Sequence, residues 1–255
     1  PLTKRNILKI SAMFYDPLGM ISPITLQSKL IFHDICLNKY NWDTTLKPNH
    51  IEAWSKFIIG LKLLKRISVA RHVLCKCGNR EVELHGFSDS SGEAYCACIY
   101  ILNRCSHGTT VALLTSKCRL VPLKSFTIPR LELLACVLLS NLLISVLKAL
   151  KGEVKVTAMF CWSDSMVALW WIKEVHKRWG VWVQNRVDII RGSTSPDIWF
   201  HVPSKSNPSD ISTRSVSLDH LDFVHWLNSP QFLLDHPDNW PSKELVSSAE
   251  TNLEE

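Results

Sequence analysis

The chain has 255 residues, enough for one large domain or two ordinary ones. Hydrophobic residues make up 46% and charged residues 20%, a globular composition that excludes a disordered chain. Five polar residues interrupt the longest apolar stretch, 131–150, so no run reaches the ~18 residues typical of a membrane span. The formal net charge of +6 suits a polyanionic partner.

The chain begins at Pro1 rather than at a methionine, which indicates a fragment of a longer product whose targeting signals lie elsewhere. Its nine cysteines are an odd number in apolar or strand-like contexts, which predicts buried thiols in a reducing compartment. The pairs Cys75/Cys77 and Cys96/Cys98 do not favour a structural zinc site, because only one residue separates the cysteines within each pair.

The N-terminal third predicts helices and no catalytic constellation. Apolar residues recur at helical spacing over 5–15, from Pro23 to about Leu37, and over 51–65. Asp16-Pro17-Leu18-Gly19 predicts a turn between the first two helices. We interpret this region as a helical packing or connecting module.

From about Ile67 the pattern changes to a mixed α/β architecture. Three strands, 82–87, 94–102 and 110–120, are joined by short polar connections and predict an antiparallel meander. A helix over 129–150, opened by Pro129 and closed by Gly152, separates them from a fourth strand, 155–161. The remaining predicted elements are helices over 166–175 and 178–190, a strand over 198–202 and a helix from 208 to 213.

The segment beyond residue 215 reads as loop-rich. Trp226 and Trp240 are the large apolar side chains that we expect to anchor it. Residues 243–255 read as an acidic tail that frays from the fold.

Four acidic residues stand at unusual places in this pattern. Asp89 ends the first strand, Asp164 ends the fourth, and Asp210 begins the last helix. Glu132 projects onto the apolar face of its helix, where an unpaired carboxylate is costly. Each acid alone has an ordinary alternative: a turn former, a first-turn glutamate that favours the helix dipole, or a helix cap.

Together the four acids predict a metal site. If the first and fourth strands are neighbours in the sheet, the four carboxylates converge at one edge and repel one another unless cations bind. Carboxylate oxygens select Mg²⁺ or Mn²⁺. Two such ions about 4 Å apart form the usual arrangement for phosphodiester hydrolysis.

The sequence motifs around these acids resemble those of a known family. Four stretches resemble the RNase H region of BEL/Pao-type LTR retrotransposon polyproteins. They are 87–91 (Phe-Ser-Asp-Ser-Ser), 128–133 (Ile-Pro-Arg-Leu-Glu-Leu), 162–165 (Trp-Ser-Asp-Ser) and 201–210 (His-Val-Pro-Ser-Lys-Ser-Asn-Pro-Ser-Asp). Residues 14–19, Phe-Tyr-Asp-Pro-Leu-Gly, resemble the segment that joins reverse transcriptase to RNase H in that family. The resemblance covers about residues 3–215, in a family region also labelled a Pao retrotransposon peptidase.

The resemblance implies an RNase H-like mixed sheet, three antiparallel strands followed by parallel strands, flanked by helices and preceded by a helical connection module. It divides the chain into a connection module (1–78), an RNase H-like domain (79–215) and a C-terminal extension (216–255). It also implies cleavage of the RNA strand of RNA–DNA hybrids with two Mg²⁺ or Mn²⁺ ions, held by Asp89, Glu132, Asp164 and Asp210. The implied partners are the hybrid and an upstream reverse transcriptase, with no membrane, in the cytoplasm or in virus-like particles.

Binding a hybrid requires contacts to phosphates and 2′-hydroxyls. The residues that we predict to supply them are Ser90, Ser91, Lys117, Arg119, Lys124, Arg130 and Lys205. The basic and aromatic stretch 170–182 is a second candidate, although helical spacing also explains its tryptophans as core residues. Some RNases H carry a mobile histidine before the last aspartate. The loop 204–209 has none, so Lys205 is a weak substitute and His201 receives no catalytic role.

Other functions stay open at this point. A catalytically silent nucleic-acid-binding or connection fragment fits the same pattern. An integrase-like nuclease of the same fold is disfavoured by the fourth acid. An aspartic peptidase is disfavoured because Asp89-Ser90-Ser91-Gly92 does not match Asp-Thr/Ser-Gly, and the paired aspartates of a polymerase are absent from the sequence.

Overall fold

The computed structural model describes residues 1–66, 68–69, 72–74, 80–106, 108–123, 126–214 and 223–241. Three of the expectations above fall outside these ranges: the cysteine pair Cys75/Cys77, the phosphate contact at Lys124, and the acidic tail over 243–255.

The described chain contains seven helices, five strands and several 3₁₀ turns. The helices are α1 (Lys4–Ser11), α2 (Ser22–Leu37), α3 (Pro48–Gly60), α4 (Ile128–Leu150), α5 (Met166–Lys173), α6 (Val181–Ser193) and α7 (Phe223–Asn228). The strands are β1 (Glu81–Ser90), β2 (Ala94–Cys105), β3 (Gly108–Leu120), β4 (Lys155–Ser163) and β5 (Trp199–His201). The 3₁₀ turns used below are η3 (Ser204–Ser206), η4 (Pro208–Ser212) and η6 (Gln231–Leu234).

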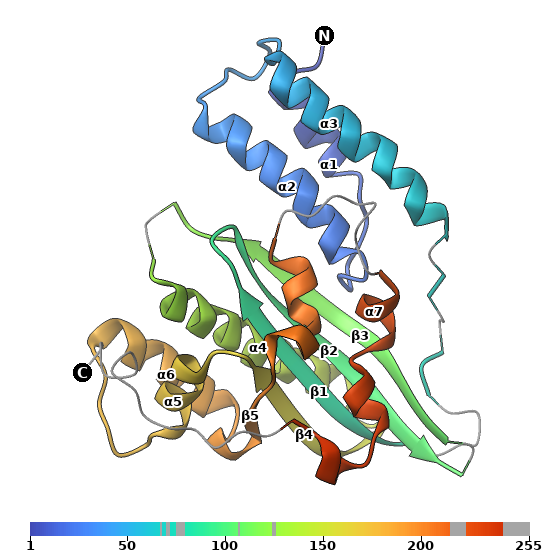
Figure 1. Cartoon of the computed structure of the whole chain (residues 1–255), viewed down its shortest axis with the longest axis vertical. Helices are drawn as coiled ribbons and strands as arrows, with labels where there is room; N and C mark the ends of the chain where they lie inside the picture. The colour runs from blue at the N-terminus through green and yellow to red at the C-terminus, as the bar shows by residue number, and fades with distance from the viewer. Residues whose placement is uncertain are drawn as a thin grey trace.

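The five strands form one sheet in the order β3-β2-β1-β4-β5 (Figure 1). β1, β2 and β3 pair antiparallel, which confirms the predicted meander. β4 pairs parallel to β1, and β5 parallel to β4, so the first and fourth strands are neighbours as the four-acid argument requires. This mixed sheet with flanking helices is the expected RNase H-like fold.

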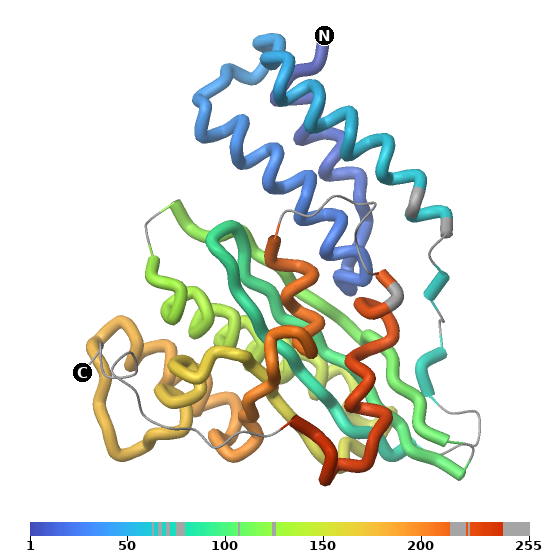
Figure 2. The backbone as a smooth tube through the Cα atoms, in the orientation of Figure 1, coloured from blue at the N-terminus to red at the C-terminus, as the bar shows by residue number. Residues whose placement is uncertain are grey.

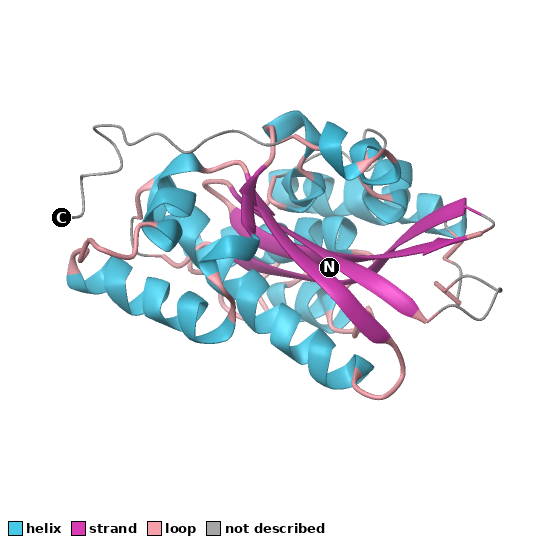
Figure 3. Cartoon of the chain, turned by 90° about the horizontal axis from the view of Figure 1, so that it is seen from below, coloured by secondary structure: helices cyan, strands magenta, loops and turns pink. Residues whose placement is uncertain are grey.

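Helices and turns cover both faces of the sheet (Figure 3). On one face α4, α5 and α6 bury alternate residues of the central strands, among them Leu84, Ala97 and Ile99. Gly86 lets α4 approach this face, because a Cβ at that position would lie 2.5 Å from Leu139 Cδ1. On the other face the intervening residues, such as Phe87 and Cys98, pack against segments that follow β5.

α4 is the central helix of the first layer. Pro129 occupies its first turn, where a missing backbone N–H costs nothing. In the described part of the chain it alone is long and apolar enough to cross a membrane. Ten of its residues are buried in the fold, including Leu139 and Leu143, so here it serves as a core helix.

The three N-terminal helices have a small core of their own, built from residues such as Ile7, Ile35 and Trp54. The turn after α1 attaches this module to β3: Ser116 N and Thr115 Oγ1 both donate to Leu18 O, at 2.8 Å each. Gly19 sits at φ +73°, and a Cβ there would lie 2.1 Å from Ser116 O. The predicted Asp16–Gly19 turn is therefore the docking point of the module, and only glycine fits its last position.

The C-terminal segment runs beside the N-terminal module on the second face of the sheet (Figure 2). Trp226 is fully buried and anchors it, as predicted: its indole donates to Met20 O at 2.8 Å, and its carbonyl accepts from Tyr100 Oη at 2.6 Å. The seven cysteines of the described residues are free thiols, and five of them are buried.

Candidate metal centre

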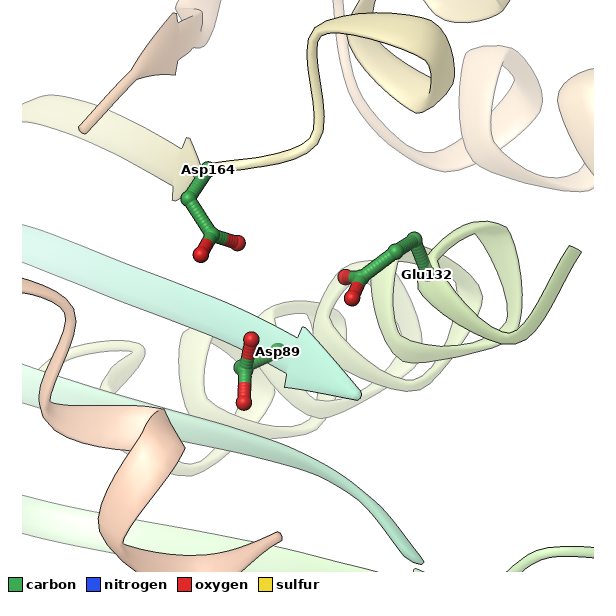
Figure 4. A group of neighbouring side chains, drawn as sticks. All are labelled: Asp89, Glu132 and Asp164. Atoms are coloured by element: carbon green, nitrogen blue, oxygen red, sulfur yellow. The ribbon is translucent and has the colours of Figure 1, made fainter. Parts of the chain in front are cut away.

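Three acidic side chains from three different elements meet at one end of the sheet (Figure 4). Asp89 lies near the end of β1, Glu132 on the second turn of α4, and Asp164 directly after β4. One carboxylate oxygen of each lies within 4.8 Å of the other two. Parallel pairing of β1 and β4 produces this convergence, because it brings their carboxyl ends to the same edge.

None of the three acids fills the ordinary structural role, as a turn former, a helix cap or a first-turn glutamate, that its place in the sequence also allowed. Ser91 makes the turn after β1, accepting from Glu93 N at 3.0 Å. Ser165 caps α5 by accepting from Ala168 N at 3.2 Å, so Asp164 is not the cap. Glu132 lies beyond the first turn of α4 and is 6% exposed, which confirms its helical projection. The ordinary explanations for these three acids therefore fail.

Hydroxyl and backbone donors hold the three carboxylates in place. Thr213 Oγ1 donates to Asp89 Oδ2 at 2.8 Å. Ser90 donates to Glu132 Oε1 from its hydroxyl at 2.8 Å and from its backbone N–H at 3.3 Å. Ser204 Oγ donates to Asp164 Oδ2 at 2.5 Å. Each carboxylate thus has one oxygen held by a hydrogen bond.

The cluster is electrostatically unfavourable without a cation. Burial, followed by the Asp164 carboxylate, raises the pKa of Asp89 to about 8. Burial, followed by the Asp89 carboxylate, raises the pKa of Glu132 to about 9. Among the described residues, the Arg214 guanidinium is the cation that acts to lower the pKa of Asp89. Like charges in a poorly solvated site produce these shifts, and a bound cation would reverse them.

The unpaired oxygens fit a divalent metal ion. Glu132 Oε2 and Asp164 Oδ1 are buried and have no hydrogen-bond partner among the described residues. A buried carboxylate oxygen without a partner is costly, and coordination to a metal is a usual way to compensate it. The donor set consists of carboxylate oxygens, which suits a hard cation such as Mg²⁺ or Mn²⁺.

Asp210, the fourth predicted ligand, lies in η4 outside the cluster of three. Its carboxylate pairs with Arg214 Nε at 3.0 Å and is 41% exposed. It is still close enough to contribute to the raised pKa of Asp89. The predicted C-terminal helix at this point is the short 3₁₀ turn η4, capped by Asn207. The role of Asp210 as a metal ligand stays a prediction.

The predicted nucleic-acid contacts among the described residues fall in four places. Ser90 supports Glu132, and the Ser91 hydroxyl donates to Thr213 O, so both hydroxyls are engaged within the site. Lys117 and Arg119 are exposed on β3, two strands away from β1. Lys205 is exposed in η3, beside the Ser204 that holds Asp164.

Arg130 lies at the start of α4 and stacks on an aromatic residue of α6. Its guanidinium carbon is 5.2 Å from the centre of the Trp182 ring, and that of Arg186 is 4.1 Å from it. Within the basic stretch 170–182, Trp171 and Trp179 are buried core residues, whereas Trp182 is half-buried.

Three supporting residues were missed by the sequence reasoning: Thr213, Ser204 and Asn207. Asn207 Nδ2 donates to Ser88 O at 2.9 Å and so ties the segment that follows β5 to β1. Ser204 and Asn207 lie inside the stretch 201–210, whose sequence resembles the family motif, whereas nothing in the sequence around Thr213 indicates its role. His201 lies on β5 opposite Ser163.

Several solved structures share features with the chain at low similarity. RNase H1 from the halophilic archaeon Halobacterium salinarum NRC-1 is 14% identical over 51% of this chain and 90% of its own, with a TM-score of 0.31. The N-terminal RNase H domain of Rv2228c from Mycobacterium tuberculosis is 12% identical over 51% and 86%, with a TM-score of 0.33. A foamy viral protease–reverse transcriptase in complex with double-stranded DNA is 11% identical over 85% and 36%, with a TM-score of 0.36.

No curated protein matches the chain. A family model does: the model described as Pao retrotransposon-like RNaseH-like domain matches residues 3–165. That range is more than half of the chain and contains the N-terminal helices, the meander, α4 and the three clustered acids. The chain therefore belongs to the family of Pao retrotransposon-like RNaseH-like domains.

Proposed function

We propose that the chain is a metal-dependent endonuclease that cleaves the RNA strand of RNA–DNA hybrids during reverse transcription of a retrotransposon. The observation that carries this proposal is the convergence of Asp89, Glu132 and Asp164. None of the three is needed for local structure: Ser91 forms the turn after β1, Ser165 caps α5, and Glu132 lies beyond the first turn of α4. Family membership supports a nuclease of the ribonuclease H kind.

In this proposal the three carboxylates hold two Mg²⁺ or Mn²⁺ ions, with Asp210 as a further ligand at the rim. Bound divalent ions lower the pKa of an attacking water and neutralise the leaving 3′ oxygen. The chain's own contribution is to orient the ligands: Thr213, Ser90 and Ser204 each fix one carboxylate oxygen. Such supporting hydrogen bonds tune metal affinity about 10- to 100-fold.

The proposal also covers the context of the chain. Residues 1–78 would connect an upstream reverse transcriptase of the same polyprotein to the nuclease domain, 79–215, and the C-terminal extension would cover the second face of the sheet. Reverse transcription of this kind would take place in the cytoplasm or in virus-like particles. The separate small core of the N-terminal helices supports a connecting module.

The test is cleavage of a hybrid whose RNA strand is labelled. We expect the purified chain with Mg²⁺ to cut the RNA strand of the hybrid, and to leave single-stranded RNA and double-stranded DNA intact. Asp164→Asn removes the charge of one ligand and keeps its shape. Loss of a hydrogen bond that merely supports a ligand costs about 10- to 100-fold. Loss of the ligand charge itself should cost more, so we expect cleavage to be at least about 100-fold slower.

Glu153→Gln is a matched control, because Glu153 is an exposed acid on the turn after α4. It should cut as fast as the unaltered chain. An intact hybrid, or equal cutting by Asp164→Asn, would refute the catalytic proposal. A hybrid that is bound but never cut would instead favour the catalytically silent fragment.

A further inference from the structure

A groove lies between the N-terminal module and the RNase H-like sheet. It encloses a cavity of ≈ 620 Å³ lined by α1, the turn after it, α2, β3 and α4. A second cavity of ≈ 250 Å³, between β3 and α4, continues it. Lys117, Leu142 and Ser145 line both cavities, so the two form one trough, which we call the module groove.

The module groove carries a net positive charge. Lys29 of α2 and Lys117 line the larger cavity, and Lys117 and Arg119 line the smaller one. None of these three cations has an ion-pair partner in the described part of the chain. Asp16 is the one acid among the lining residues, and its oxygens accept from the backbone amides of Met20 and Ile21 at 2.8 and 2.9 Å.

The walls of the module groove are fixed, and one polar atom within it lacks a partner. The Leu18–Gly19 turn is bonded to β3, and Ser116 Oγ also donates to Gly19 O at 2.6 Å. Ser11 lines the groove, and its Oγ is buried without a hydrogen-bond partner among the described residues. A fixed, positively charged trough with an unused hydroxyl suits an anionic ligand that supplies acceptor oxygens.

The module groove is continuous with the end of the sheet that holds the metal centre. Arg119 pairs across β3 and β2 with Tyr95, and Tyr95 pairs across β2 and β1 with Ser90. Two strand spacings separate Arg119 from Ser90, about 10 Å. Lys117 lies two residues further along the same face of β3, about 7 Å away. Arg119 and Lys117 therefore lead away from the proposed cut site toward the larger cavity, which Lys29 also lines.

We propose that the module groove binds the phosphate backbone of the nucleic acid beyond the cut site, through Lys29, Lys117 and Arg119. This inference rests on the proposed function and adds to it a second contact region, shared between the two units of the chain. The contacts would be to backbone phosphates, because the cations and hydroxyls offer charge and donors, and they would carry no sequence preference.

The test is the salt dependence of hybrid binding in EDTA, where cleavage plays no part. The variant is Lys29→Ala with Lys117→Ala, and the probe is a fluorescent RNA–DNA hybrid of about 20 base pairs. Each lost phosphate contact lowers the slope of log K against log salt concentration by about 0.9. We expect the variant to lose about 1.8 of that slope and at least 10-fold in affinity.

Two further variants complete the design. Lys29→Arg with Lys117→Arg keeps both charges and should retain the full slope, and Lys47→Ala, at an exposed lysine outside the groove, should do the same. An unchanged slope in the double alanine variant would overturn the groove inference while leaving hybrid cleavage intact. Failure of the unaltered chain to bind any hybrid would overturn the proposed function, and the groove inference with it.

Discussion

Replacing Glu132 with glutamine should make the metal-free chain more stable, which is the opposite of the usual result of altering a buried residue. Glutamine is neutral at every pH, so the folded variant does not carry the cost of placing an ionisable carboxyl group in this buried, acidic site. Its carbonyl oxygen can still accept the two hydrogen bonds that Ser90 donates to Glu132 Oε1. Its amide replaces Oε2, the buried oxygen without a partner among the described residues, and can donate to the neighbouring carboxylates.

The magnitude follows from the raised pKa. The pKa of Glu132 rises from 4.5 to about 9 in the folded chain, because of burial first and the Asp89 carboxylate second. Each pH unit above 4.5 costs the folded state about 1.4 kcal/mol, which gives an upper limit of about 3 kcal/mol at pH 7. Asp89 and Glu132 share this repulsion, so we expect a gain of about 1–3 kcal/mol.

The sign of the pH dependence is fixed by proton binding. Between pH 4.5 and pH 9 the folded chain binds more protons than the unfolded chain, so the unfolding free energy of the unaltered protein falls as pH rises. The advantage of Glu132→Gln should therefore be small near pH 4.5 and grow toward pH 9. Urea unfolding in EDTA at a series of pH values measures it.

Magnesium should reverse the order of stability. A ligand at 100 times its dissociation constant stabilises the folded state by about 2.7 kcal/mol, and the variant lacks one ligand charge. We expect Mg²⁺ to raise the unfolding free energy of the unaltered chain and of Glu153→Gln, but not that of Glu132→Gln. A variant that is less stable in EDTA at every pH, with the same response to Mg²⁺ as the unaltered chain, would refute the reasoning.

Three further changes test the supporting structure. Thr213→Val keeps the side-chain shape but removes the donor to Asp89 Oδ2, so Mg²⁺ affinity, read from the metal-induced gain in stability, should fall about 10-fold; an unchanged affinity would contradict this role. Gly19→Ala should cost about 1–3 kcal/mol in urea unfolding because of its positive φ and the close Ser116 O, whereas Gly92→Ala, with open space around it, should cost less than about 1 kcal/mol. Asp210→Asn should slow hybrid cleavage less than Asp89→Asn does, because Asp210 lies outside the cluster of three; equal losses would contradict its place at the rim of the site.

The sequence predicted the architecture well wherever one physical signal dominated. Alternation over β1 and β2, with a short polar turn between them, determined the meander, and the apolar stripe of α4 placed Glu132 on the buried side. Both are local consequences of hydrophobic periodicity. The adjacency of β1 and β4 was instead a condition of the argument from the four acids, and the parallel strands were implied by the family resemblance.

The supporting contacts could not be predicted in the same way, because they depend on how distant segments meet. The hydroxyl of Thr213 reaches Asp89 across 124 positions of sequence, and a threonine in that place is unremarkable. The stretch Asp16-Pro17-Leu18-Gly19 predicted a turn, but the contact of Leu18 and Gly19 with Ser116 is a property of the docked module. For Asp210, a helix start was inferred from Pro208, whereas packing leaves a single 3₁₀ turn and directs the carboxylate to Arg214.

The chemical nature of the products tests the central claim most directly. Hydrolysis in which a metal-activated water attacks and the 3′ oxygen leaves gives RNA fragments with 5′-phosphate and 3′-hydroxyl ends. Mass spectrometry of the fragments cut from a hybrid should find these ends in Mg²⁺, and no fragments with Asp89→Asn or in EDTA. Fragments with 2′,3′-cyclic phosphate ends, or the same fragments from Asp89→Asn, would contradict the assignment of this carboxylate cluster as the nuclease centre.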